Sequence, residues 1–219
     1  RPPPPPPHCL EAPAHAMVVH AYNAVSEGVT TAEEVDAAFA QLLASPGWRE
    51  LETKTSRRMC DQYTFEGDSG RPPPPHLRFL HTLVGRLLDR LQSDCGDDEV
   101  IPMQCFLCLY EDGDDSCPAH AHDCRQLTLS FGAERSLMVV DRPYRMQHGD
   151  VVVLDGERHS VPAQRGAPCE PRVSLNLFFA TALDLATRPV SVNGRAGSGY
   201  RPAGGAAAKG RGRGRQGDH

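Results

Sequence analysis

The sequence of 219 residues has no long apolar run and few aromatic residues, which make up 6% of it and include a single tryptophan. No apolar stretch approaches the ~20 residues that a transmembrane helix requires, so we expect no membrane span. Residues 1–7 are an arginine and six prolines, without the apolar core of a signal peptide. These absences favour an intracellular protein, nuclear or cytoplasmic, with no membrane partner.

The sequence also lacks the signs of a disulfide framework, although it contains eight cysteines. In a chain of this length without a secretion signal, reduced thiols are the expected state. The segment Cys105-Phe-Leu-Cys108 has the spacing of a zinc ligand pair, and Cys117 and Cys124 follow it. Zinc knuckles usually place this pair on a turn, whereas here it brackets apolar residues of an expected strand. We therefore favour core packing and keep a zinc site as the main structural alternative.

The two ends of the chain differ in composition from the part between them. The prolines near the start predict a polyproline-like extension over residues 1–16, and the Gly, Ala and Arg of residues 191–219 predict a disordered tail. That tail holds six basic residues and one acidic residue, so with a net charge of −5 the remainder carries about −10. The basic residues at 209–215 suit either phosphate contacts or a solubilising role. Residues 17–190 predict one domain.

Two segments in the first half have the pattern of helices. Residues 31–45 begin with Thr31 and Glu34, the two positions of a capping box, continue with apolar residues at helical spacing, and end at Pro46. Residues 76–93 carry an apolar stripe that is too long for a strand. After Asp98 the periodicity changes. Five runs rich in β-branched and aromatic residues predict strands at 103–110, 126–131, 136–140, 151–154 and 172–179. Helices followed by strands predict an α+β domain whose sheet closes into a sandwich or jelly roll.

A group of potential metal ligands accompanies these strands. His120 and His122 are two residues apart, so both can face the same side of a strand, and His159 follows a later strand. Neutral imidazoles suit a first-row metal such as iron, for which a carboxylate is normally the third ligand. Arg172 begins another strand and is suited to clamp the far carboxylate of an oxo-acid. The alternative is that these are solvated loop histidines in a chain that has ten of them.

Several short motifs, in their order along the chain, carry a resemblance to a known family. They are Cys108-Leu-Tyr-Glu-Asp-Gly113, His120, Leu127-Thr-Leu-Ser-Phe-Gly-Ala133, His148-Gly-Asp-Val-Val-Val-Leu154, His159-Ser-Val-Pro162 and Pro171-Arg-Val-Ser-Leu-Asn-Leu177. Together they resemble the AlkB-like family of iron(II)/2-oxoglutarate dioxygenases, over most of residues 17–180. The resemblance implies a double-stranded β-helix (jelly-roll) core backed by two main helices, with Fe(II) and 2-oxoglutarate as cofactors.

The resemblance also assigns expected roles to individual residues. His120 and His159 match iron ligands of the family. Arg172 matches the arginine that binds the far carboxylate of 2-oxoglutarate, and Tyr110 matches a tyrosine that contacts this co-substrate. We include Ser174 with these two as a cofactor-binding residue.

The chain departs from the family pattern at three positions. His122 stands where the family has its aspartate ligand, and Asp123 follows it. Either the site has three histidines or a bulge lets Asp123 coordinate. We favour His122, because Asp123 would point to the opposite face of a regular strand. Cys108 replaces an asparagine, and Phe178 replaces a second arginine that helps to hold the other end of the co-substrate.

The resemblance implies oxidative demethylation or hydroxylation, with N-methylated bases of DNA or RNA as the expected substrate. The Arg/Gly tail favours a nucleic acid, whereas five acidic residues near the presumed site mouth would repel phosphates; they are Glu99, Glu111, Asp112, Asp114 and Asp115. Tyr63 and Phe65 are candidates for stacking on a flipped base, although packing is the commoner role of such residues. The alternatives are a catalytically weakened or inactive binding module of this family and a dioxygenase that acts on protein side chains.

Overall fold

A computed structural model describes residues 20–54, 56–65, 73–166 and 169–192 of the chain. The expected Pro-rich extension lies outside these residues. The expected Gly/Arg-rich tail, apart from its first two residues, lies outside them as well.

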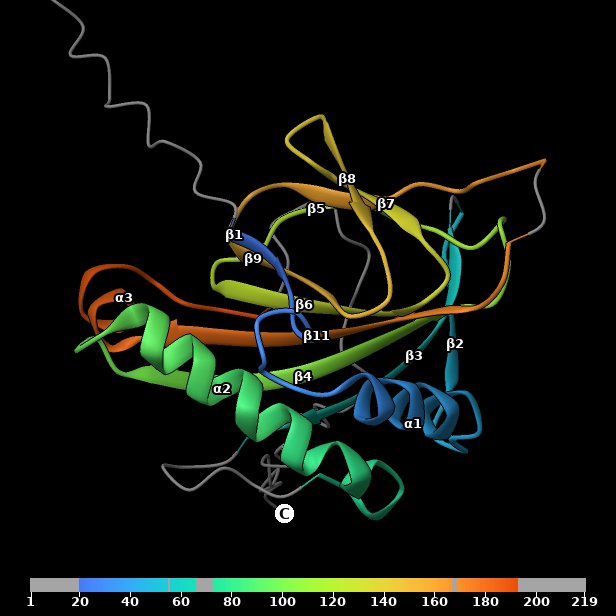
Figure 1. Cartoon of the computed structure of the whole chain (residues 1–219). Coiled ribbons are helices and arrows are strands. Elements are labelled where there is room, and N and C mark those ends of the chain that lie inside the picture. The colour runs from blue at the N-terminus through green and yellow to red at the C-terminus, as the bar shows by residue number, and fades with distance from the viewer. Residues whose placement is uncertain (1–19, 55, 66–72, 167–168, 193–219) are drawn as a thin grey trace, which may run out of the picture.

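Two antiparallel sheets face each other and form the jelly-roll core that the sequence predicts (Figure 1). The larger sheet consists, in spatial order, of β1 (His20–Asn23), β9 (Asp150–Asp155), β6 (Arg125–Gly132), β11 (Arg172–Thr181), β4 (Val100–Tyr110), β3 (Arg57–Thr64) and β2 (Arg49–Glu52). The smaller sheet consists of β5 (Cys117–His120), β10 (His159–Val161), β7 (Arg135–Val139) and β8 (Arg142–Met146).

Helices cover the face of the larger sheet that points away from the smaller one (Figure 1). They are α1 (Ala32–Leu43) and α2 (His81–Cys95), which follows a 3₁₀ turn, η1 (Pro75–Leu80). A short helix, α3 (Ala182–Thr187), follows β11. The predicted capping box is confirmed, since Thr31 accepts a hydrogen bond from the Glu34 backbone and Glu34 accepts one from the Thr31 backbone.

The alternation of side chains along the long strands separates the core from the interior of the jelly roll. On β4, β6 and β11 the odd-numbered side chains pack against the helices, and even-numbered ones face the smaller sheet. Leu107, Leu129 and Leu175 are fully buried on the helix side, where each stabilises the fold by roughly 1.5–3 kcal/mol. Because the period of a strand is two residues, a slip of one residue would drive Arg172 into this apolar layer. Packing therefore sets which side chains reach the interior.

The five predicted strands are confirmed with shifted ends. The largest local difference is at Val140, which was expected to end a strand but adopts a φ of 43° beside Asp141 at 65°. These two residues connect β7 to β8, and two positive φ values in a two-residue hairpin loop match the twist of the flanking strands. The sequence patterns did not predict β1, β2, β3, β5, β8, β10 or α3.

The cysteines behave as apolar side chains of the core. Cys105 is fully buried on the helix side of β4, and Cys108 faces the interior of the jelly roll. Residues three apart on a strand point to opposite faces, so this pair does not share a metal site, and core packing replaces the zinc alternative. The seven cysteines that the structure describes are free thiols. Within the described residues, no helix is both long and apolar enough to cross a bilayer.

Candidate metal centre and anion pocket

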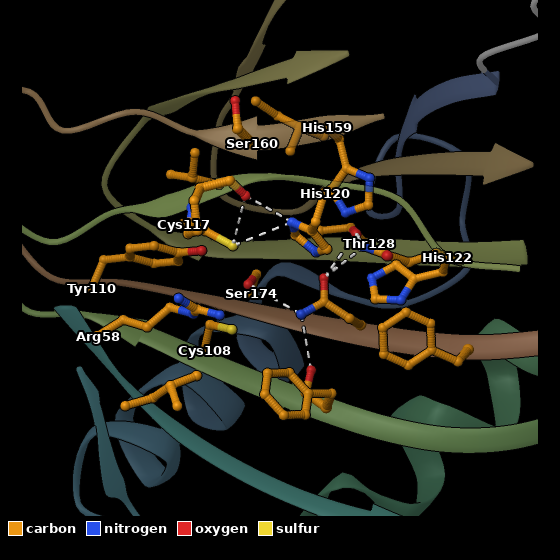
Figure 2. A pocket seen from close by; sticks show the side chains of 18 of the residues that line it. Arg58, Cys108, Tyr110, Cys117, His120, His122, Thr128, His159, Ser160 and Ser174 are labelled. Carbon is orange, nitrogen blue, oxygen red and sulfur yellow. Dashed lines mark hydrogen bonds between the residues drawn. The ribbon is translucent and has the colours of Figure 1, made fainter. Parts of the chain in front are cut away.

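A pocket lies between the two sheets and contains about 940 Å³ of empty space, part of which is open to solvent. Its floor is formed by even-numbered residues of β4, β6 and β11, and its roof by β5 and β10. Figure 2 shows three histidines gathered at one end, with Arg58, Cys108 and Tyr110 at the other. The two ends of the pocket differ in chemistry.

The three predicted histidines converge in this pocket. His120 on β5 and His159 on β10 are direct cross-strand partners, and their ring centroids are 4.4 Å apart. The His122 ring lies 4.8 Å from that of His120 and 5.6 Å from that of His159. Each imidazole offers one nitrogen as a ligand atom, and the three ligand atoms lie within 4.8 Å of one another. The arrangement fits a single metal ion.

Hydrogen bonds to backbone carbonyls orient each imidazole. The Nδ1 atoms lie 2.8 Å from Pro118 O for His120, 3.0 Å from Val192 O for His122 and 2.9 Å from Glu157 O for His159. A carbonyl oxygen only accepts, so each Nδ1 carries the proton and each Nε2 keeps its lone pair. The Nε2 atom of His122 is buried and has no hydrogen-bond partner among the described residues. Three such nitrogens form a donor set suited to a divalent first-row metal.

The histidines are held neutral at physiological pH. Burial is the main cause, followed by repulsion from the imidazole of His120; together they lower the pKa of His122 to about 4 and that of His159 to about 3. Burial also lowers the pKa of His120. A neutral imidazole is the form that binds a metal, so no proton has to leave before coordination.

Asp123 is not part of this cluster. Its backbone forms a pair of hydrogen bonds with Ser191, of 3.2 and 3.4 Å, and the next residue, Val192, accepts the hydrogen bond from His122. The segment that follows α3 therefore holds residues 122–123 and orients His122 toward the other two histidines. The geometry places His122, and not Asp123, beside His120 and His159.

Arg172 lies at the opposite end of the pocket. It is 1% exposed, and its Nε donates to Ser130 Oγ at 2.9 Å. Its two terminal nitrogens are buried and have no hydrogen-bond partner among the described residues. The guanidinium lies 5.3 Å from the centre of the Tyr110 ring, and burial lowers the pKa of Arg172. A buried cation with two terminal nitrogens in this state is suited to bind an anion.

A polar network covers the floor between the two ends. Asn176 Oδ1 accepts from Thr128 at 2.9 Å and from Gln126 at 3.1 Å, while Asn176 Nδ2 donates to Ser174 Oγ at 3.3 Å. These bonds hold Ser174 in the pocket beside the predicted co-substrate site. The ring of Phe178, where the resemblance implied an arginine, lies 4.6 Å from that of His122.

Tyr63 and Phe65 do not line the pocket. Their rings are 5.3 Å apart, and both pack in the helix-side core. Odd-numbered residues of β3 face the helices, so the expectation that these two stack on a substrate is wrong on geometric grounds. The aromatic ring of Phe106 lies in the pocket wall instead. The sequence placed Phe106 in an expected strand but gave it no role in the site.

The acidic residues do not form one cluster at the pocket mouth, contrary to expectation. Glu99 and Glu111 flank opposite ends of β4. Asp115 is fully buried, where it accepts from Arg57 Nε at 2.8 Å, and Asp112 is paired with the same arginine at 3.1 Å. The negative charges of Asp112 and Asp115 are thus neutralised locally.

Sequence reasoning missed several residues that line the pocket, namely Arg58, Phe106, Gln126, Thr128 and Asn176. Each is an interior-facing residue of a strand in the larger sheet. Polar residues at alternate positions ordinarily indicate the solvent-facing side of a sheet. The pattern of one strand does not show that a second sheet covers that side, so these residues were not predicted to line a pocket.

Comparisons with protein-family models and with curated proteins find no match. Solved structures share the fold. An oxidoreductase of the 2OG-Fe(II) oxygenase family from Burkholderia pseudomallei is 18% identical, with a TM-score of 0.51 over 70% of this chain and 81% of its own. SnoN, a non-heme alpha-ketoglutarate-dependent epimerase from nogalamycin biosynthesis, is 14% identical, with a TM-score of 0.50 over 76% and 79%. The structure of OsALKBH1 is 12% identical, with a TM-score of 0.43 over 68% of this chain and 92% of its own.

Proposed function

We propose that this protein is a non-haem iron(II)/2-oxoglutarate-dependent dioxygenase that carries out oxidative demethylation or hydroxylation. One observation carries the proposal. Three neutral imidazoles converge in one pocket, opposite a buried arginine whose terminal nitrogens have no hydrogen-bond partner among the described residues. His120, His122 and His159 would hold the iron. When bound, the iron and the oxo-acid would supply the activation of dioxygen for oxidation of the substrate.

The remaining pocket residues bind and orient. The free guanidinium nitrogens of Arg172 suit the far carboxylate of 2-oxoglutarate, with Tyr110 and Ser174 beside it. Phe178 places an apolar ring against His122 and excludes water from that side of the metal centre. The chain thus contributes orientation and a shielded cavity.

For the substrate we propose an N-methylated base of DNA or RNA. The basic residues at 209–215 support this choice, because they are suited to phosphate contacts. Phe106 supports it as well, since it offers an aromatic face on the pocket wall. Release of formaldehyde from methylated oligonucleotides and from methylated peptides, compared side by side, distinguishes this substrate from protein side chains.

A binding module without turnover is the second candidate, and two residues favour it. His122 gives the metal a neutral ligand where the family has a carboxylate, and Phe178 removes a cation that holds the co-substrate. Succinate formation by the purified protein separates the two candidates. The oxygenase predicts formation that requires both iron and 2-oxoglutarate and is absent from His159→Ala; a metal-bound protein that forms no succinate supports the binding module.

A further inference from the structure

Arg58 is a second buried arginine in the pocket. It lies on β3, is 8% exposed and has two nitrogens, Nε and Nη1, that are buried without a hydrogen-bond partner among the described residues. Figure 2 shows its side chain beside Cys108 and Tyr110, across the pocket from the histidines. The adjacent Arg57 points to the other face and is paired with Asp112 and Asp115. Two neighbouring arginines of one strand therefore differ in whether a carboxylate accompanies them.

The buried carboxylates of the described chain are engaged elsewhere. Asp115 is bound by Arg57, and Asp184 by Arg125 and Arg188. Burial disfavours the charge of a guanidinium, and for Arg58 the groups that offset this are thiols and the Tyr110 hydroxyl, with no carboxylate among them. Such groups are expected where a ligand supplies the missing charge.

The nearest acidic group is the thiol of Cys108. A hydrogen bond from Cys60, the charge of Arg58 and a hydrogen bond from it, and the charge of Arg172 together outweigh burial and lower the pKa of Cys108 to about 6. One thiolate offers a single charge to two guanidinium groups, and both of these still have unpaired nitrogens. This end of the pocket therefore remains positively charged in the ligand-free protein.

We propose that Arg58 is a second anion-binding residue, which holds a carboxylate of the dicarboxylic oxo-acid together with Arg172. From β3 it adds a second positive charge at the end of the pocket where Arg172 lies, away from Phe178 and His122. The inference rests on the proposed function, since the oxo-acid is the co-substrate of that reaction. It makes Arg58 a specificity residue for a dianion over a monocarboxylic oxo-acid.

Titration calorimetry under anaerobic conditions with Mn(II)-loaded protein tests this directly. Arg58→Gln is expected to weaken 2-oxoglutarate binding roughly 10- to 100-fold and to leave Mn(II) binding unchanged. Arg49→Gln is the matched control, because it removes the same charge from an exposed position on β2; binding is expected to stay within about twofold of the wild type. If the wild type and Arg58→Gln bind 2-oxoglutarate equally well, the inference about Arg58 is wrong and the proposed function still stands. Failure of the metal-loaded wild type to bind 2-oxoglutarate overturns the proposed function and the inference with it.

A second variant separates direct binding from an effect through the thiol. Cys108→Ser removes the thiolate, and we expect it to bind 2-oxoglutarate at least as tightly as the wild type. If Cys108→Ser reproduces the loss seen in Arg58→Gln, the arginine acts through the thiol and the inference is wrong.

Thermal unfolding supplies a readout that is independent of calorimetry. Arg58→Met removes the buried cation and keeps an unbranched side chain in its place. The rise in Tm on adding 2-oxoglutarate to the metal-loaded variant is expected to be smaller. A lower Tm for the ligand-free variant, with an undiminished response to 2-oxoglutarate, would show a structural role and contradict the inference.

Discussion

The two ends of the pocket differ in which polar atoms the folded chain leaves unpaired. At the metal end each imidazole is fixed through Nδ1 by a backbone carbonyl, and its lone pair at Nε2 points into the cavity. At the other end, guanidinium N–H groups of Arg58 and Arg172 lack partners among the described residues. Unpaired acceptors select a cation, whereas unpaired donors select an anion. The difference indicates that the two ends bind chemically opposite ligands.

The two sheets explain how this difference arises. The histidines come from short strands of three and four residues in the smaller sheet and from the segment just after them. The carbonyls that accept from Nδ1 belong to β5 (Pro118), to the loop before β10 (Glu157) and to the segment after α3 (Val192). The arginines come from strands of eight and ten residues in the larger sheet, whose backbone groups pair with neighbouring strands. Side chains there depend on other side chains, or on a ligand, for their partners.

The largest expected effect comes from deleting a histidine. His159→Ala should abolish metal retention, with a loss of affinity of at least roughly 100-fold, because one of three donors is removed. Metal content after dialysis, measured by atomic emission, checks this. His81→Ala, at an exposed position at the start of α2, is the control and should retain the metal. Normal metal content in His159→Ala would remove that residue from the site.

The next effect is expected at the other end of the pocket. Arg172→Gln should weaken 2-oxoglutarate binding by roughly 10- to 100-fold, because charge-assisted hydrogen bonds to the carboxylate are lost. Metal binding should remain within about twofold of the wild type, which calorimetric titration of each ligand can determine. Equal loss of both ligands would contradict the division of the pocket into two ends.

A smaller effect is expected from placing a cation at the metal end. Phe178→Arg sets a guanidinium beside the ring of His122, and repulsion should lower metal affinity roughly tenfold. Adding His122→Asp should restore the affinity, because a carboxylate ligand neutralises the new charge. Phe178→Leu, which keeps this position neutral, is the control and should bind the metal normally. Additive losses in the double variant would show that the two positions do not interact.

The smallest effect is expected from Asp123. Asp123→Asn should change metal affinity by no more than about twofold, since the histidine cluster does not include this side chain. His122→Ala, the adjacent comparison, should lose the metal as His159→Ala does. A large loss in Asp123→Asn alone would identify the aspartate as a ligand and remove His122 from the site.

Local sequence patterns predicted the site residues that lie at the end or at the start of a clear apolar run. His159 comes after the apolar run that forms β9, and Arg172 begins the run that forms β11, so each could be placed relative to a strand. Arg58 could not, because β3 alternates charged, sulfur-containing and polar residues and resembles an exposed strand. Its environment is set by Tyr110 and Cys108, which are about fifty residues away in sequence, and by the smaller sheet above it. Burial created by distant segments leaves no local signal.

Anaerobic titration with iron(II) and 2-oxoglutarate, followed by absorption spectroscopy, tests the central claim most directly. Three free imidazole nitrogens at one end of the pocket and unpaired guanidinium groups at the other predict that the oxo-acid chelates the iron. A weak metal-to-ligand charge-transfer band should appear only when both are present, and it should be absent from His159→Ala. A wild-type protein that binds iron and 2-oxoglutarate without this band, or that binds neither, would contradict the account.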